Sequence, residues 1–125
     1  MNTIVQKFGG TSVATKEARE FVYEKIMRAK DEGYRLVVIV SAMGRSGDPY
    51  ATDTLLDLIR KSNGTNNKRE MDMIYSCGEI ISASIIASTL ESRGYKAISL
   101  SGQQAGIITN NNYFDAEVEY IKTSK

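Results

Sequence analysis

The segment KFGGTS at residues 7–12 combines a lysine, two glycines and two hydroxyl side chains after a short β-branched run. The adjacent Gly9 and Gly10 weaken any strand that continues, so the chain is expected to turn there. Glycines let a phosphate approach backbone N–H groups, and a helix that follows adds its positive N-terminal end. Lys7 would supply a point charge for phosphoryl oxygens. The alternative is a plain tight turn beside an exposed lysine, and these residues taken alone favour that alternative.

This segment matches neither of the common glycine-rich nucleotide motifs. A P-loop has its lysine after the glycines, whereas Lys7 precedes Gly9. The sequence contains no G-x-G-x-x-G either. Phosphate binding here would therefore depend on open backbone and one positive charge.

A long polar loop is predicted at residues 41–53, directly after the apolar run LVVIV. Ser41 could offer a hydroxyl and an N–H to a ligand at the end of that strand, and Thr52 offers a second hydroxyl. The alternatives are a strand-ending turn residue for Ser41 and a helix N-cap for Thr52. The loop is long for a strand–helix connection, which favours a functional role.

Glu79 belongs to SCGE at residues 76–79, at the edge of an apolar stretch. A carboxylate in such a place is costly unless it is paired. Its partner could be the ammonium group of a ligand or a neighbouring Lys or Arg, and both interpretations stay open. Gln103 and Gln104 could touch a substrate or a second subunit, although a capped turn explains them more simply.

The composition narrows the chemistry that this chain can perform. Its 125 residues include no histidine and a single cysteine, Cys77, which we interpret as a packing residue. His-based zinc sites, Ser-His-Asp catalysis and internal disulfides are therefore excluded within the chain. The remaining groups are Lys, Asp, Glu, Ser, Thr and the backbone, and these are the groups that phosphoryl transfer uses.

The length and charge are those of one soluble domain. A net charge of +1 gives no general attraction to nucleic acid or to an anionic membrane. The longest clearly apolar run, at residues 36–40, is too short to cross a bilayer, and the N-terminus has no signal-peptide pattern. We therefore expect a cytoplasmic protein with neither nucleic-acid nor membrane partners.

The apolar patterns predict strands that alternate with helices. The predicted strands cover residues 3–8, 36–40 and 95–100, with a short strand possible within 101–109 and a fourth near 116–121. The predicted helices cover residues 15–31, a short stretch around 55–59 begun by Thr52 or Asp53, and 68–93 with a break or kink at 76–78. This order indicates βαβ units and a mostly parallel sheet with helices on both faces.

Ligands of such sheets bind beyond the carboxyl ends of the strands. Three loops should gather at that edge, at residues 7–12, 41–53 and 101–106. The candidate residues Lys7, Ser41 and Thr52 would then lie near one another.

Five segments, in one order, resemble the N-terminal part of aspartate kinase, a family of the amino-acid kinase superfamily. They are VQKFGGTS, VVIVSAMG, TDTLLDL, REMDMIYSCGEIISA and SGQQAGIIT. KFGGTS together with SCGE is the specific combination, and the similarity fades after Asn110. The resemblance implies a three-layer α/β/α fold with a mostly parallel sheet, of which residues 1–125 form the N-terminal, substrate-side portion.

The resemblance also implies an activity, which is ATP-dependent phosphorylation of the side-chain carboxylate of L-aspartate to 4-phospho-L-aspartate. This is the entry step to lysine, threonine and methionine synthesis. In the family, the lysine matching Lys7 steadies the transferring charge, and Mg²⁺ neutralises the phosphates, although no ligand for it is evident here. The residues expected at the ATP phosphates are Lys7, Phe8, Gly9 and Gly10. The residues expected to hold aspartate are Ser41, Thr52 and Glu79, with Glu79 facing the α-ammonium group.

Other parts of the family have no counterpart in these 125 residues. They are the nucleotide-binding half, with its RGGSD-type loop and ADPR stretch, the arginine that grips the α-carboxylate of aspartate, and the regulatory ACT domains. We therefore expect a portion of a longer, homo-oligomeric enzyme, with little or no activity by itself. Part of its sheet should be uncovered.

Two other functions stay open at this point. One keeps the fold and changes the phosphoryl acceptor to another small carboxylate or a carbamate. The other is a binding or assembly module that kept the scaffold and lost catalysis.

Overall fold

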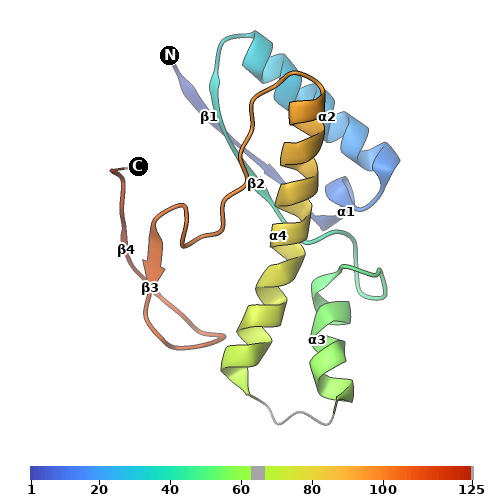
Figure 1. Cartoon of the computed structure of the whole chain (residues 1–125), viewed down its shortest axis with the longest axis vertical. Coiled ribbons are helices and arrows are strands. Elements are labelled where there is room, and N and C mark those ends of the chain that lie inside the picture. The colour runs from blue at the N-terminus through green and yellow to red at the C-terminus, as the bar shows by residue number, and fades with distance from the viewer. Residues whose placement is uncertain (63–66, 125) are drawn as a thin grey trace.

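The computed structural model describes residues 1–62 and 67–124, whose elements follow the order β1–α1–α2–β2–α3–α4–β3–β4 (Figure 1). β1 (Thr3–Phe8) and β2 (Arg35–Val40) pair in parallel along their whole length. The crossover between them is made by α1 (Gly10–Val13) and α2 (Lys16–Asp31). The predicted βαβ unit and the α/β fold class are therefore confirmed. The single turn α1 was not predicted.

The ends of α2 follow local sequence signals. Its N-cap is Thr15, whose Oγ1 accepts a hydrogen bond from the N–H of Ala18 at 3.0 Å. Its C-cap is Glu32, and Gly33 follows with φ +90°, a conformation that glycine adopts without strain. These two signals place the helix where its apolar spacing predicted it.

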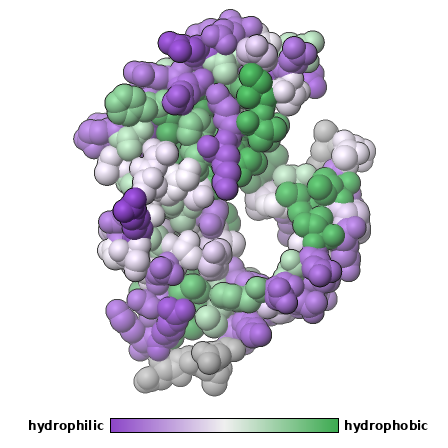
Figure 2. Space-filling view, turned by 180° about the vertical axis from the view of Figure 1, so that it is seen from behind, coloured by the Kyte–Doolittle hydropathy of each residue, from purple (hydrophilic) through white to green (hydrophobic). Residues whose placement is uncertain are grey.

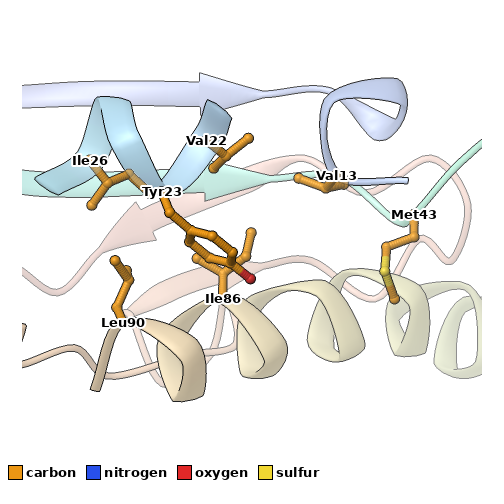
Figure 3. Packing of buried hydrophobic residues seen from close by; sticks show 7 residues of the cluster. All are labelled: Val13, Val22, Tyr23, Ile26, Met43, Ile86 and Leu90. Carbon is orange, nitrogen blue, oxygen red and sulfur yellow. The ribbon is translucent and has the colours of Figure 1, made fainter. Parts of the chain in front are cut away.

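The main core lies between α2, α4 (Lys68–Ser92) and one face of the β1–β2 pair. Side chains of the two helices point toward one another beside the strands (Figure 3). The buried cluster consists of Val13, Val22, Tyr23, Ile26, Met43, Ile86 and Leu90. The strand residues that pack against it are Phe8, Leu36, Val38 and Val40. Their period of two identifies a single covered face of the strands.

The opposite face of the β1–β2 pair is exposed. Val5 is 65% exposed, Val37 45% and Ile39 47%. The run LVVIV is typical of a strand that is covered on both faces. Within the described residues the helices α2 and α4 cover one face only, so the predicted helices on both faces are not found there. Part of the sheet is uncovered, as expected for the N-terminal portion of the fold. Seen from behind, apolar surface flanks the hollow between the main body and the arm that contains β3 (Ile107–Thr109) and β4 (Val118–Ile121) (Figure 2).

Helix α4 is continuous, so the predicted break at residues 76–78 is wrong. Gly78 is instead a packing position, because a Cβ placed there would lie 2.7 Å from Cβ of Ala42. Among the described helices, α4 alone is long and apolar enough to cross a membrane by length and composition. Its buried residues recur every four positions and make one packing face, which is typical of a helix at the core of a protein. They are Gly78, Ser82, Ile86 and Leu90.

The predicted third strand at residues 95–100 is wrong, because this segment joins no strand ladder. Tyr95 and Ala97 still pack against the core. The N–H of Ala97 donates to Oε1 of Glu91 at 2.8 Å rather than to a neighbouring strand. The alternating pattern therefore marked the correct buried positions but did not ensure strand pairing.

The two strands predicted near the end of the sequence are confirmed as β3 (Ile107–Thr109) and β4 (Val118–Ile121). They pair with each other antiparallel and form a second sheet, separate from β1–β2. This hairpin makes the arm in Figure 1 that lies beside the lower half of α4.

Candidate functional site

A pocket of about 300 Å³ lies beyond the carboxyl ends of β1 and β2. Gly10 comes from the turn after β1, and residues of the loop after β2 form most of the lining. The pocket is closed by the start of α3 (Thr52–Lys61) and by two residues of α4. The lining residues of this pocket from the loop after β2 are Ser41, Ala42, Gly44, Arg45, Ser46 and Ala51. Two of the three predicted loops therefore meet here, and residues 101–106 do not line this pocket.

Backbone hydrogen bonds join the two loops. The N–H of Gly44 donates to the carbonyl of Gly10 at 2.9 Å, and the N–H of Ser41 donates to that of Phe8 at 3.1 Å. A Cβ at position 10 would lie 2.7 Å from the Gly44 oxygen and 2.9 Å from the Ala42 oxygen. Gly10 is therefore needed for this close approach, and the turn after β1 is fixed to the loop after β2.

Hydrogen bonds within the loop at residues 44–51 fix its conformation. The N–H of Arg45 donates to Oδ2 of Asp48 at 2.8 Å, and the N–H of Asp48 donates to the Arg45 carbonyl at 2.9 Å. Gly44 and Gly47 have φ values of +89° and +96°, which side chains with a Cβ rarely adopt. The backbone of Arg45 is thus held at the pocket by bonds on both sides.

Glu79 enters the pocket from α4, next to the packing position Gly78. Its Oε2 is buried and has no hydrogen-bond partner within the part of the chain that the structure describes. No Lys or Arg among the described residues forms an ion pair with it. The alternative of a neighbouring cation is therefore not observed, and a buried acceptor atom is available to a ligand.

Ser41 and Thr52 line the same pocket as Glu79. The prediction that Thr52 or Asp53 caps the following helix is wrong, because the N-cap of α3 is Ala51, without a side-chain hydrogen bond. Thr52 is instead the first residue of α3 and Asp53 lies in its first turn. The hydroxyl of Thr52 is therefore not engaged in capping its own helix.

The residues predicted to contact the ATP phosphates do not all lie at the pocket. Gly10 lines the pocket, while Lys7, Phe8 and Gly9 are not part of its lining. Phe8 packs its ring against the core. Lys7 is exposed and pairs in register with Ile39, on the uncovered face of the strands. The roles of these residues at a phosphate chain stay predictions.

Three charged residues line the pocket, which are Arg45, Asp53 and Glu79. Sequence reasoning missed Arg45 and the ring of Tyr75, which also lines the pocket and meets Phe114 edge-on at 5.9 Å between centroids. The length of the loop at residues 41–53 indicated a functional loop but did not single out Arg45 within it. Within residues 1–62 and 67–124, no group of three or more metal-ligating side chains could hold an ion, so these residues do not by themselves fit a Mg²⁺ site.

The sequence model of the amino acid kinase family matches residues 2–125. The match covers the parallel strands, the core helices α2 and α4, and every residue that lines the pocket. The chain belongs to the amino acid kinase family.

Several relatives of this chain are aspartokinases. Aspartokinase 1 of Bacillus subtilis (strain 168) is 46% identical over 125 residues, which are 100% of this chain and 31% of that protein. The aspartokinase of Geobacillus stearothermophilus is 42% identical, over 100% of this chain and 30% of its own length. A crystal structure of aspartate kinase from Synechocystis matches with a TM-score of 0.74 and 44% identity, over 86% of this chain and 18% of that one. The chain thus spans less than a third of the length of these relatives.

Proposed function

We propose that this chain supplies the amino-acid-binding side of an aspartate kinase, which transfers the γ-phosphoryl group of ATP to the side-chain carboxylate of L-aspartate. The identities with aspartokinases support this proposal. In such an enzyme, residues 1–125 would act as the N-terminal portion of the kinase domain, and the portion by itself is expected to have little activity.

The observation that carries the proposal is the unpaired oxygen of Glu79 beside two hydroxyl residues. Its buried Oε2 lies in the pocket that Ser41 and Thr52 also line. An α-ammonium group would satisfy this oxygen and the negative charge together, and such charge-assisted bonds are among the stronger ones in proteins. Ser41 and Thr52 can donate or accept hydrogen bonds with the remaining polar atoms of aspartate.

Phosphoryl transfer needs stabilisation of the charge on the transferring group. Gly10 brings backbone without a side chain to the pocket, and we assign Lys7, Phe8 and Gly9 to the adjoining phosphate chain of ATP. Lys7 would contribute its ammonium group there, and Mg²⁺ would arrive with the nucleotide and neutralise its phosphates. The complete enzyme is expected to be a cytoplasmic homo-oligomer in lysine, threonine and methionine synthesis.

Kinetics of the complete natural polypeptide that contains this sequence test the proposal. The enzyme should phosphorylate L-aspartate, and Glu79→Gln should raise the KM for aspartate by about tenfold or more, because it removes the charge that faces the ammonium group. The KM for ATP should stay within about twofold, since Glu79 does not face the phosphates in this assignment.

Glu70→Gln is the matched control, because Glu70 is an exposed carboxylate of the same helix that pairs with Arg69 at the surface. An unaltered KM for aspartate in Glu79→Gln would remove Glu79 from the site. Transfer to a different carboxylate or carbamate, with none to aspartate, would establish the other acceptor class. Binding of aspartate and ATP without any turnover would support a module that has lost catalysis.

A further inference from the structure

The pocket contains more negative than positive side chains. Asp53 and Glu79 contribute two carboxylates, and Arg45 contributes the sole cation among the described lining residues. An acidic amino acid carries two carboxylates and one ammonium group, so it enters with a net negative charge. Like charges at close range cost free energy unless an opposite charge offsets them. Glu79 can pair with the ammonium group of the ligand, but its negative charge repels both carboxylates of the ligand.

The guanidinium group of Arg45 is available for that task. Its side chain forms no hydrogen bond or ion pair with any residue that the structure describes, while its backbone N–H and carbonyl are both bonded to Asp48. The residue before it, Gly44, is bonded to Gly10 at 2.9 Å. The backbone of Arg45 is therefore held in place at the pocket, while its planar guanidinium group is free to donate hydrogen bonds.

We propose that Arg45 binds a carboxylate of the acidic amino acid in this pocket, which makes it a specificity-determining residue opposite in charge to Glu79. The planar guanidinium can donate two parallel hydrogen bonds to one carboxylate, a geometry that adds selectivity as well as affinity. Together the two residues would select a ligand that has an ammonium group and a carboxylate. This inference rests on the proposed function, since it concerns the amino acid that the enzyme phosphorylates.

Arg45→Gln tests the inference in the complete polypeptide. The variant should raise the KM for aspartate by about tenfold or more, because a charged donor pair is lost, and should leave the KM for ATP within about twofold. Arg45→Lys should restore only part of the affinity, because an ammonium group cannot form the bidentate pair. The thermal midpoint of both variants should equal that of the unsubstituted enzyme, since the replaced side chain is exposed.

Arg35→Gln is the matched control, because Arg35 is also exposed and lies at the opposite end of β2 from the pocket. Its KM values should not change. Inhibition by the α-amide and by the β-amide of aspartate then identifies the carboxylate. The unsubstituted enzyme should discriminate against the amide at the contacted position, and Arg45→Gln should lose that discrimination.

The outcomes separate this inference from the function on which it rests. Aspartate turnover with an unchanged KM in Arg45→Gln overturns the role of Arg45 and leaves the function standing. A raised KM for ATP with an unchanged KM for aspartate also overturns it, since Arg45 would then serve a phosphate. If aspartate is bound but not phosphorylated, the proposed function is overturned. The role of Arg45 is then tested by calorimetry: a weaker affinity of Arg45→Gln for aspartate supports it, and an unchanged affinity overturns it. If aspartate does not bind, both are overturned.

Discussion

The two faces of β2 both carry branched apolar side chains but have different surroundings. On one face, Leu36, Val38 and Val40 pack against the core formed by α2 and α4. On the other face, Val37 and Ile39 are 45% and 47% exposed. The difference teaches that hydrophobicity of a strand fixes which residues can be buried, whereas the arrangement of neighbouring elements decides which of them are buried here.

The pocket lies at the carboxyl ends of β1 and β2, among the loops that follow these strands. Glu79 comes from a helix on the covered side, while Lys7 shares its face with Val5 on the exposed side. Glu79, which is proposed to bind the amino acid, is therefore held by a helix of the packed core, whereas Lys7, which is proposed to bind the phosphates, lies on the exposed face. The amino-acid side of the proposed site, with Glu79, therefore belongs to the covered side of the strands, and the phosphate side, with Lys7, belongs to the exposed side.

Truncation of one side chain in the core on the covered side, and of one side chain on the exposed face of β2, should give the largest contrast. Leu90→Ala, at a position 4% exposed, should lower the free energy of unfolding by about 2–5 kcal/mol, because it removes buried methyl groups and leaves a cavity. Val37→Ala should cost less than about 1 kcal/mol, since much of its side chain already meets water. Denaturation by urea, followed by circular dichroism, measures both. Equal losses would show that the exposed face is covered in solution, and dilution would reveal whether a second copy covers it.

A pair of glycines provides the next contrast. Gly10→Ala should destabilise by about 1–3 kcal/mol, because its Cβ would meet the Gly44 oxygen at 2.7 Å and the backbone must shift. Gly9→Ala should change stability by less than about 0.5 kcal/mol, since nothing lies within 4 Å of its added Cβ and its φ of −76° suits any residue. Urea denaturation compares the two variants. If Gly10→Ala were as stable as Gly9→Ala, the close approach of the two loops would be absent in solution.

The sequence predicted the elements whose signals are local. Helix α2 was predicted from the apolar spacing of residues 15–31, and the structure shows that a cap at Thr15 and the glycine Gly33, both of which act within one turn, set its ends. The segment at residues 95–100 was wrongly predicted as a strand, because pairing depends on a neighbour that a pattern does not specify. The supposed break at Gly78 was wrong for a related reason, since this glycine makes room for Ala42, a residue far away in the sequence.

The candidate site was predictable in part. Ser41 and Thr52 were singled out by their positions at a strand end and a helix start, and Glu79 by its place at the edge of an apolar stretch. The pocket does bring the three together. Arg45 was missed, because an exposed arginine in a polar loop has no distinguishing local pattern. Its relevance depends on the bonds from Asp48 and Gly44 that fix the loop, and these appear only in three dimensions.

The smallest expected effect concerns an ion pair at the border of the covered side. Arg93, the C-cap of α4, donates to both carboxylate oxygens of Glu20 in α2, at 2.9 and 2.7 Å, and lies 4.6 Å from the ring centre of Tyr23. The hydrogen bonds from Arg93 hold the pKa of Glu20 below its ordinary value of 4.5, and its charge adds to the effect. A lowered pKa in the folded state means that the stabilisation is present above the unfolded-state pKa and is lost as the pH falls through the folded-state pKa.

Glu20→Gln should therefore lower the urea midpoint slightly at pH about 7. The difference from the unsubstituted chain should vanish at pH about 2–3, where the protonated side chain of Glu20 is as neutral as the glutamine that replaces it. Salt should weaken the effect, since both partners are exposed to solvent. Glu24→Gln is the control, because Glu24 is an exposed carboxylate of the same helix with no ion pair to a described residue. A difference that persists undiminished at low pH would mean that Glu20 stabilises the covered side through packing of its methylene groups rather than through its charge.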